Sequence, residues 1–325
     1  MTFNEQTMKV WQTPSARFSD MKDFPFQSHY ISINGLRMHY VDEGNVNSQP
    51  VLLLHGVPAW CYLYRHMIKR ISESGNRVIA PDLIGFGKSD KPARVGSHTY
   101  QSHIGWMRFF LDYLHLKNII LFGHDWGSLI GLRIVAGSPD LFNGIIISNG
   151  MLPTGEQKMH YSFNIWRIFS RYSPFLPVDR VIEYGMSKRL CREERRAYRA
   201  PFPSSGYKAG IRALPGRVPV SPYDPESAEN IKAWDVLGKW KKPFLTVFSE
   251  NDPVTRGGDK YLQARIPGCE GQNHILLPGG HFIQEESSEE LCRIIIDFVK
   301  TADSWHKKYQ TQSNDLELPD RKHRS

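Results

Sequence analysis

An aspartate between two glycines is the strongest chemical signal in this chain of 325 residues. The motif Gly123-His124-Asp125-Trp126-Gly127 follows the apolar run Ile119–Phe122 and precedes a predicted helix over Ser128–Ala136. Such glycines permit a sharp strand-to-helix turn that presents the central side chain at the carboxyl end of a strand. A carboxylate there is ionised at neutral pH and can attack a carbon atom to form an ester. We therefore predict that Asp125 is a nucleophile rather than a residue that only caps the following helix.

Two residues that follow later strands could complete a catalytic triad. In folds with this kind of turn, the chain order is nucleophile, acid and then histidine. Asp252 lies at the mouth of one late predicted strand, with Glu250 as a nearby competitor, and His281 lies just past the next strand. We predict that His281 is the general base and that Asp252, in preference to Glu250, orients it.

Backbone and indole N–H groups near the motif could stabilise negative charge. Hydrolysis of an ester on Asp125 needs donors for the oxyanion that develops. We predict that these are the backbone N–H groups of Trp126 and of Val57, which lies in the loop after an earlier strand. The Trp126 indole is a donor with no acceptor and could also bind an anion such as a departing halide. Trp166 offers a second indole of this kind.

The spacing of histidines and cysteines argues against a metal or redox site. No pair of the 13 histidines has metal-ligand spacing, so we predict no metal. His55 and His124 flank the site and are predicted to make supporting hydrogen bonds. The four cysteines form no Cys-x-x-Cys pair. Free thiols, together with the lack of an apolar segment in the first twenty residues, favour a cytoplasmic location.

The predicted elements form an α/β fold that could bring these residues together. The β-rich runs are Tyr30–Ile33, Met38–Asp42, Val51–Leu54, Val78–Ala80, Ile119–Phe122, Ile145–Ser148, Phe244–Phe248 and Ile275–Leu277. Most of the later runs are continuously apolar, as expected for strands buried on both faces. Amphipathic stretches such as Ser102–Leu116 and Glu289–Lys300 fit helices between or after strands. We predict about eight strands in a mostly parallel sheet with helices on both faces.

The strand rhythm stops after residue 150 and resumes at Phe244. The intervening chain is rich in arginine, aromatic residues and segments bounded by proline, which indicates short helices. We therefore predict a core of residues 1–150 and 226–300, a helical cap of residues 151–225, and a polar, frayed tail of residues 301–325. No apolar run approaches the ~18 residues needed to span a bilayer, so no membrane partner is predicted.

The formal net charge of +8 is concentrated in the predicted cap. Met151–Pro225 contains 13 Lys and Arg against 6 Asp and Glu, which leaves +1 for the other 250 residues. No nucleic-acid-binding motif accompanies these charges, so no nucleic-acid partner is predicted. The four arginines between residues 192 and 199 lie at helical spacing with two glutamates among them, which favours a solvated, partly paired helix face. The alternative is a positive field over the entrance of a pocket.

These motifs together resemble the haloalkane dehalogenases of the α/β-hydrolase superfamily over about residues 17–300. The matching segments are Phe24–Gly44, His55–Trp60, Pro81–Asp90, Gly123–Gly127, Ala200–Pro203, Tyr207–Gly210 and His281–Glu285. The cap segments are similar to the subfamily that takes its second halide-binding tryptophan from the cap, which corresponds to Trp166. That subfamily places its catalytic acid where Asp252 stands, whereas Asn149 occupies the position of the acid in another subfamily. Val57 departs from the Asn or Glu that relatives often carry.

The resemblance implies a two-step hydrolysis of small halogenated hydrocarbons. Asp125 attacks the carbon atom, and the halide leaves toward Trp126 and Trp166. His281, held by Asp252, then takes a proton from the water that hydrolyses the Asp125 ester. The products are an alcohol, a halide and a proton, and no cofactor takes part. The protein is expected to be a monomer or a weak homo-oligomer.

Other activities of the same fold stay open from the residues alone. An epoxide hydrolase shares the aspartate motif but needs acid donors, usually two tyrosines of the cap. The cap offers Tyr161, Tyr172, Tyr184, Tyr198 and Tyr207. A non-catalytic binding protein on this fold is less favoured because the nucleophile, acid and base are all present.

Overall fold

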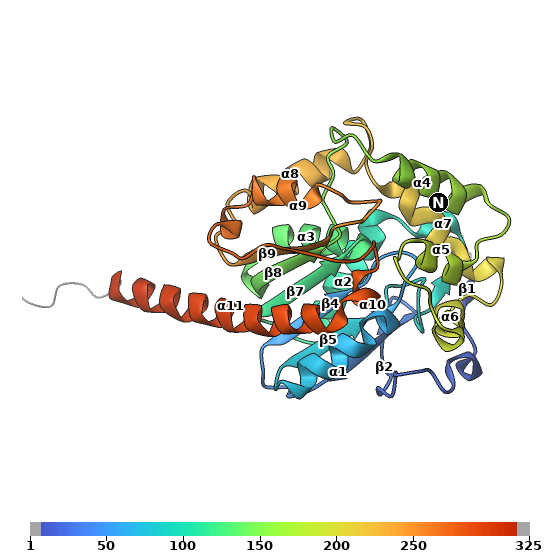
Figure 1. The fold of residues 1–325 in the computed structure, drawn as a ribbon, viewed down its shortest axis with the longest axis horizontal. Coiled ribbons are helices and arrows are strands. Elements are labelled where there is room, and N and C mark those ends of the chain that lie inside the picture. The colour runs from blue at the N-terminus through green and yellow to red at the C-terminus, as the bar shows by residue number, and fades with distance from the viewer. Residues whose placement is uncertain (1–7, 317–325) are drawn as a thin grey trace, which may run out of the picture.

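A computed structural model describes residues 8–316 of the chain, and its centre is an eight-stranded sheet (Figure 1). The strands are β2 (His29–Ile33), β3 (Leu36–Glu43), β4 (Pro50–Leu54), β5 (Arg77–Pro81), β7 (Ile119–His124), β8 (Phe142–Ser148), β9 (Phe244–Ser249) and β10 (Ile275–Leu277). Their order across the sheet is β10-β9-β8-β7-β4-β5-β3-β2. Only β2 with β3 and β3 with β5 pair in antiparallel fashion within it. The predicted fold class is confirmed.

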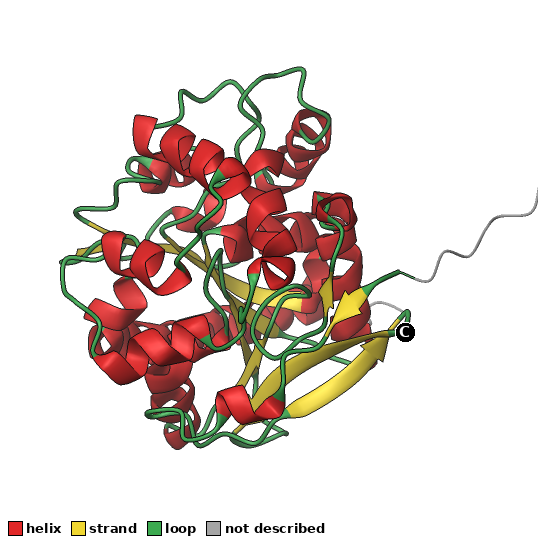
Figure 2. Ribbon diagram, turned by 90° about the vertical axis from the view of Figure 1, so that its right-hand side faces the viewer, coloured by secondary structure: helices red, strands yellow, loops and turns green. Residues whose placement is uncertain are grey.

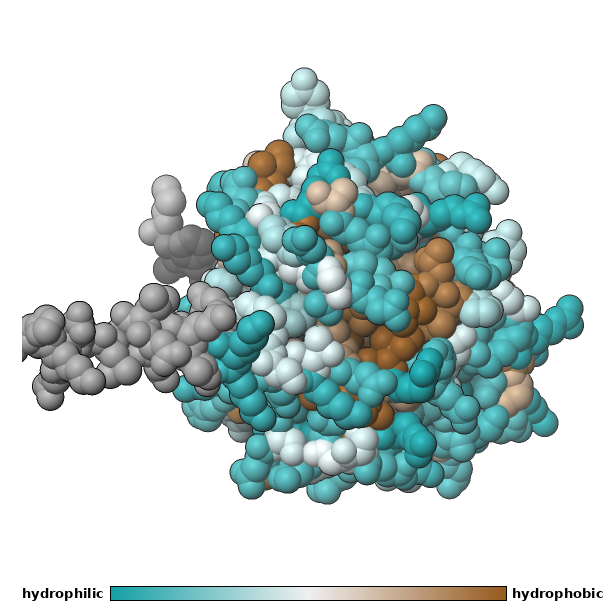
Figure 3. All heavy atoms as spheres, turned by 60° about the vertical axis from the view of Figure 1, so that its left-hand side comes forward, coloured by the Kyte–Doolittle hydropathy of each residue, from teal (hydrophilic) through white to brown (hydrophobic). Residues whose placement is uncertain are grey.

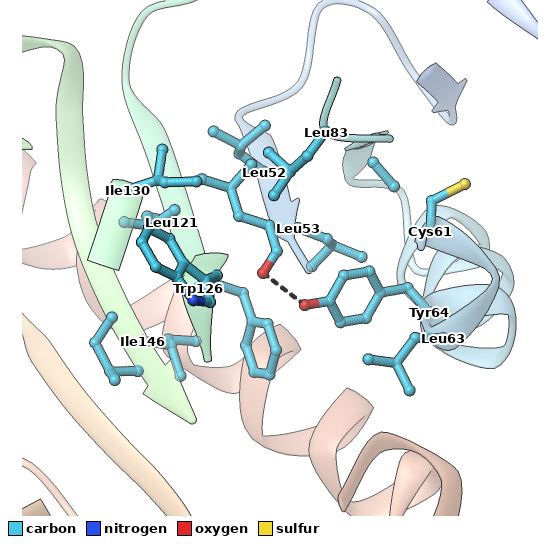
Figure 4. Packing of buried hydrophobic residues seen from close by; sticks show 14 of the residues in the cluster. Leu52, Leu53, Cys61, Leu63, Tyr64, Leu83, Leu121, Trp126, Ile130 and Ile146 are labelled. Atoms are coloured by element: carbon cyan, nitrogen blue, oxygen red, sulfur yellow. Dashed lines mark hydrogen bonds between the residues drawn. The ribbon is translucent and has the colours of Figure 1, made fainter. Parts of the chain in front are cut away.

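Burial explains the apolar composition of the central strands. All residues of β4, β7 and β8 are buried, because helices cover both faces of the sheet (Figure 2). On one side α1 (Arg65–Glu73) packs against α11 (Ser288–Leu316), and elsewhere α3 (Trp126–Gly137) packs against α2 (Tyr100–Tyr113) and α8 (Ser227–Leu237). At the end of β4 the Tyr64 hydroxyl donates a hydrogen bond of 2.8 Å to the Leu54 carbonyl (Figure 4).

Two features differ from the prediction. Helix α11 continues to Leu316, through most of the segment for which no regular structure was predicted. No glycine or proline lies between Lys300 and Leu316, so nothing in the sequence ends the helix earlier. Residues 317–325 of the predicted tail lie outside the described residues. A small antiparallel ladder of β1 (Val10–Trp11) and β6 (Lys91–Pro92) was not predicted, because two-residue strands carry no periodic signal.

Between β8 and α8 the structure is helical, without strands. The helices are α4 (Tyr161–Tyr172), α5 (Val178–Tyr184), α6 (Arg192–Arg199) and α7 (Ala209–Ala213), with 3-10 turns between them. They lie beside the loops that follow the strands (Figure 1); for example, the Trp60 indole donates to the Ala197 carbonyl at 3.2 Å.

No helix among the described residues is long and apolar enough to cross a membrane. One face of the molecule is largely hydrophilic, with apolar side chains gathered in a hollow within it (Figure 3).

Candidate active site

Asp125 stands on a strained turn between β7 and α3. Its φ of 49° and ψ of −122° lie in a region that residues other than glycine rarely adopt. The backbone N–H and the hydroxyl of Ser128 both donate to the Asp125 carbonyl, the latter at 2.6 Å. A Cβ on Gly127 would lie 1.9 Å from the Leu54 carbonyl oxygen, so only glycine allows α3 to approach β4 this closely. The turn therefore fixes where the aspartate side chain emerges.

The Asp125 carboxylate lies between a backbone donor and an imidazole. The Val57 N–H donates to Oδ1 at 2.8 Å, and His281 Nε2 lies 3.7 Å from Oδ2. Burial disfavours the charged carboxylate, but His281 and the Val57 N–H outweigh it and lower the pKa of Asp125. The side chain keeps 17% exposure. Trp126 begins α3, so its backbone N–H has no acceptor within the helix.

Asp252 orients the imidazole from the other side. His281 Nδ1 donates to Asp252 Oδ1 at 3.0 Å. The backbone N–H of Val254 holds Oδ1 at 2.8 Å, and the N–H and hydroxyl of Thr255 hold Oδ2. Despite burial, the charge of His281 and these donors lower the pKa of Asp252 to about 2. Glu250 is exposed and makes no contact with His281 among the described residues.

The imidazole of His281 lies between two carboxylates. Burial favours the neutral imidazole, yet the negative charges of Asp252 and Asp125 and the hydrogen bonds to them raise its pKa to about 10. The two carboxylates therefore stabilise the protonated form of the imidazole. Removal of one of these charges lowers its proton affinity.

Three backbone hydrogen bonds fix the main chain of His281. Its N–H donates to the carbonyl of Gly185, at the end of α5, at 2.6 Å. Its carbonyl accepts from His124 Nε2 at 2.8 Å and from the Asn149 side chain at 2.9 Å. The predicted supporting bond of His124 is thus present. The contact with Gly185 was not predicted, because backbone acceptors leave no signal in the sequence.

Two carboxylates of α10 (Ile283–Glu286) tie this segment to the cap helices. Glu285 makes a bidentate ion pair with buried Arg65, at 2.5 and 2.8 Å, and accepts from the Tyr198 hydroxyl of α6. Glu286 accepts from the backbone N–H groups of Ser187 and Gly280 at 2.8 and 2.7 Å. Glu285 and Tyr198 are 87 residues apart in the chain. Sequence patterns did not reveal this link, because only the folded chain brings the partners together.

The two predicted halide donors lie in different environments. Trp126 is 2% exposed, packs edge-on against Tyr100 at 5.1 Å, and makes no hydrogen bond through its indole N–H to any described residue. Trp166 lies partly buried on the same side of α4 as buried Phe163 and Ser170. Within residues 8–316 no ring contact joins the two indoles. A halide that accepts hydrogen bonds from both indole N–H groups would therefore have to lie between the Trp126 and Trp166 rings.

One cluster in the described part of the chain has donor types that can bind a metal. His39, Cys61 and Asp82 lie close together and are buried. The Asp82 carboxylate already bonds to His39 Nδ1 at 2.7 Å and accepts from the backbone N–H groups of Cys61 and Lys88 at 2.8 and 2.7 Å. The Asp82 carboxylate is thus already held by three protein donors, whereas His39 Nε2 is buried without a hydrogen-bond partner among the described residues.

Comparisons with known proteins agree on one family. Residues 49–288 match the family described as the alpha/beta hydrolase fold. The chain is 46% identical to a haloalkane dehalogenase of Mycolicibacterium paratuberculosis and 48% identical to one of Psychrobacter cryohalolentis; each alignment covers 90% of this chain and 98% of the relative. The tetrameric haloalkane dehalogenase DpaA of Paraglaciecola agarilytica superposes with a TM-score of 0.81 at 32% identity, over 87% of this chain and 96% of that one.

The contacts of α10 with α1 and α6 contribute to the free energy of unfolding. Glu285→Gln leaves the buried Arg65 guanidinium without a full counter-charge, so we expect the free energy of unfolding to fall by about 3 kcal/mol. Glu286→Gln is the matched control, because Glu286 binds only neutral backbone donors, and should cost about 1 kcal/mol. Urea unfolding followed by circular dichroism measures both. Equal losses for the two variants would contradict the assignment of Glu285 as the charged centre of the link.

Proposed function

Since the chain belongs to the haloalkane dehalogenases of the α/β-hydrolase fold and hydrolyses carbon–halogen bonds, we propose that Asp125 is its nucleophile. His281 and Asp252 are the base and the acid that orients it. The observation that carries this proposal is the chain of contacts from Asp252 through His281 to the ionised Asp125. Residues 151–225 are the cap of this enzyme, and the remaining α/β part is its core.

In the first step Asp125 Oδ2 attacks the carbon that carries the halogen. Oδ1 already accepts from Val57, which leaves Oδ2 for the new C–O bond while the C–X bond breaks. The electron pair of that bond leaves with the halide. The indole N–H groups of Trp126 and Trp166 receive the halide and stabilise the charge that develops on it.

Esterification of Asp125 prepares His281 for the second step. The ester has no charge, so one of the two groups that raise the pKa of His281 is lost. The imidazole then releases its proton to solvent, and neutral His281 takes a proton from a water molecule. That water attacks the ester carbonyl, whose oxygen is stabilised by the N–H groups of Val57 and Trp126. The step releases the alcohol and restores the carboxylate.

Epoxide hydrolysis is disfavoured because the cap tyrosines are engaged elsewhere or point to solvent. Tyr198 donates to Glu285, and Tyr207 stacks on Trp11 at 5.3 Å. Tyr161, Tyr172 and Tyr184 are 68%, 72% and 90% exposed. None is therefore held as an acid donor toward Asp125. A monomer or weak homo-oligomer and a cytoplasmic location stay predictions from the sequence.

The activity is tested with 1-bromobutane. We expect one bromide and one proton per turnover, since the ester route releases both, and no bromide from Asp125→Asn, whose amide cannot displace a halide. Colorimetric bromide detection and a pH-stat measure the products. Hydrolysis of styrene oxide with no bromide release from 1-bromobutane would instead favour the epoxide hydrolase.

The covalent step is tested with His281→Phe. Without a base the alkyl ester should accumulate on Asp125, because attack on carbon needs no proton transfer but hydrolysis does. Intact-protein mass spectrometry after incubation with 1-bromobutane should show one added butyl group, and peptide mapping should place it on Asp125. An unmodified His281→Phe protein would refute the ester route; wild type quenched in the same way is the control.

The halide site is tested with Trp166→Phe. Loss of one N–H donor to a desolvated anion should weaken bromide binding about tenfold or more. Quenching of tryptophan fluorescence by bromide gives the dissociation constant. Trp106→Phe, on α2 and partly buried, is the matched control and should leave the affinity unchanged. An unchanged affinity in Trp166→Phe would remove this residue from the halide site.

A further inference from the structure

Helix α4 exposes an apolar stripe to solvent. The side chains that form it are Tyr161 (68% exposed), Ile165 (61%), Ile168 (63%), Phe169 (38%) and Tyr172 (72%). Their spacing of three and four residues places them on one side of the helix. The opposite side is anchored to the protein by buried Phe163 and Ser170. One side of α4 therefore packs against the protein, and the apolar stripe on its other side faces solvent.

Positive charge predominates around this stripe. Helix α4 packs against α7 and the 3-10 turn Leu214–Arg217. The two segments that contain these elements, residues 157–177 and 200–220, hold six basic residues and no Asp or Glu: Lys158, Arg167, Arg171, Lys208, Arg212 and Arg217. None of the six forms an ion pair with a carboxylate of residues 8–316. The surface thus joins exposed aliphatic and aromatic side chains to unneutralised positive charge.

We propose that this stripe docks on the headgroup region of an anionic lipid bilayer. An interfacial helix buries its apolar face to a shallow depth, and flanking Lys and Arg bind anionic headgroups. The two tyrosines add rings that suit the membrane–water interface. A second copy of the chain fits less well, because a two-fold contact through the stripe would bring six positive charges against six. The sequence-based expectation of no membrane partner concerned spanning segments, which this mode of docking does not need.

The consequence for turnover rests on the proposed function. Haloalkanes are apolar and concentrate in bilayers, and docking through α4 would turn the cap toward that reservoir. The docking itself does not depend on the chemistry of Asp125, so the two can fail separately.

Flotation of the full chain with vesicles tests the proposal. Wild type should float with phosphatidylcholine–phosphatidylglycerol vesicles, less so with pure phosphatidylcholine, and less at 0.5 M than at 0.1 M salt, because salt screens the charges. The double variant Ile165→Ser/Ile168→Ser should lose at least about tenfold in its partition coefficient. Arg171→Gln/Arg217→Gln should lose about fivefold or more on the anionic vesicles only.

The matched control is Val46→Ser/Tyr113→Ser. It removes two apolar side chains of similar exposure, 66% and 55%, from the surface of the α/β part of the protein, outside α4. It should bind the vesicles as wild type does. Release of bromide from 1-bromobutane without vesicles, measured on every sample, reports the chemistry independently. The proposal is overturned by absent flotation of an active wild type or by equal binding to neutral and anionic vesicles. It is also overturned by a stable oligomer in sedimentation that Ile165→Ser/Ile168→Ser dissociates, which would assign the stripe to a second copy.

Discussion

The position of one imidazole depends on hydrogen bonds from several separate parts of the chain. His281 has its backbone fixed by Gly185 at the end of α5, by His124 at the end of β7 and by Asn149 after β8, while Asp252 after β9 fixes its ring. Two parallel neighbouring strands, β8 and β9, therefore contribute to the same residue from their carboxyl ends. The sheet therefore sets the spacing of Asn149 and Asp252, and the segment at the end of α5 holds His281 from the opposite side through the Gly185 carbonyl.

Electrostatics link the three titratable side chains of this group. Each carboxylate favours the protonated form of His281, and His281 lowers the pKa of both carboxylates, although burial opposes all three charges. In the proposed mechanism the charge of Asp125 is the variable part of this group, because it disappears when a covalent bond forms and returns when water cleaves it. Loss of that charge would lower the pKa of His281 and so favour the neutral imidazole that the hydrolytic step needs.

The sequence allowed prediction of the strands, of the turn at Asp125 and of the positions of Asp252 and His281 just after late strands, because each of these leaves a local pattern. Continuous apolar runs marked buried strands, and glycines marked the turn. The contacts of Gly185, Glu285 and Arg65 could not be predicted, since their partners lie far away in the chain and one of them is a backbone carbonyl. The length of α11 does not follow from the polarity of residues 301–316, because a polar segment without glycine or proline can continue a helix.

The contacts between the cap and α10 also limit how this enzyme can be recombined with its relatives. A graft of residues 151–225 alone would carry Gly185, Ser187 and Tyr198 into a new core but leave Glu285 and Glu286 behind. The transplanted cap would then meet foreign side chains at the residues just after the histidine. A functional chimaera must therefore exchange α10 together with the cap, as one cooperative unit assembled from two distant stretches of chain.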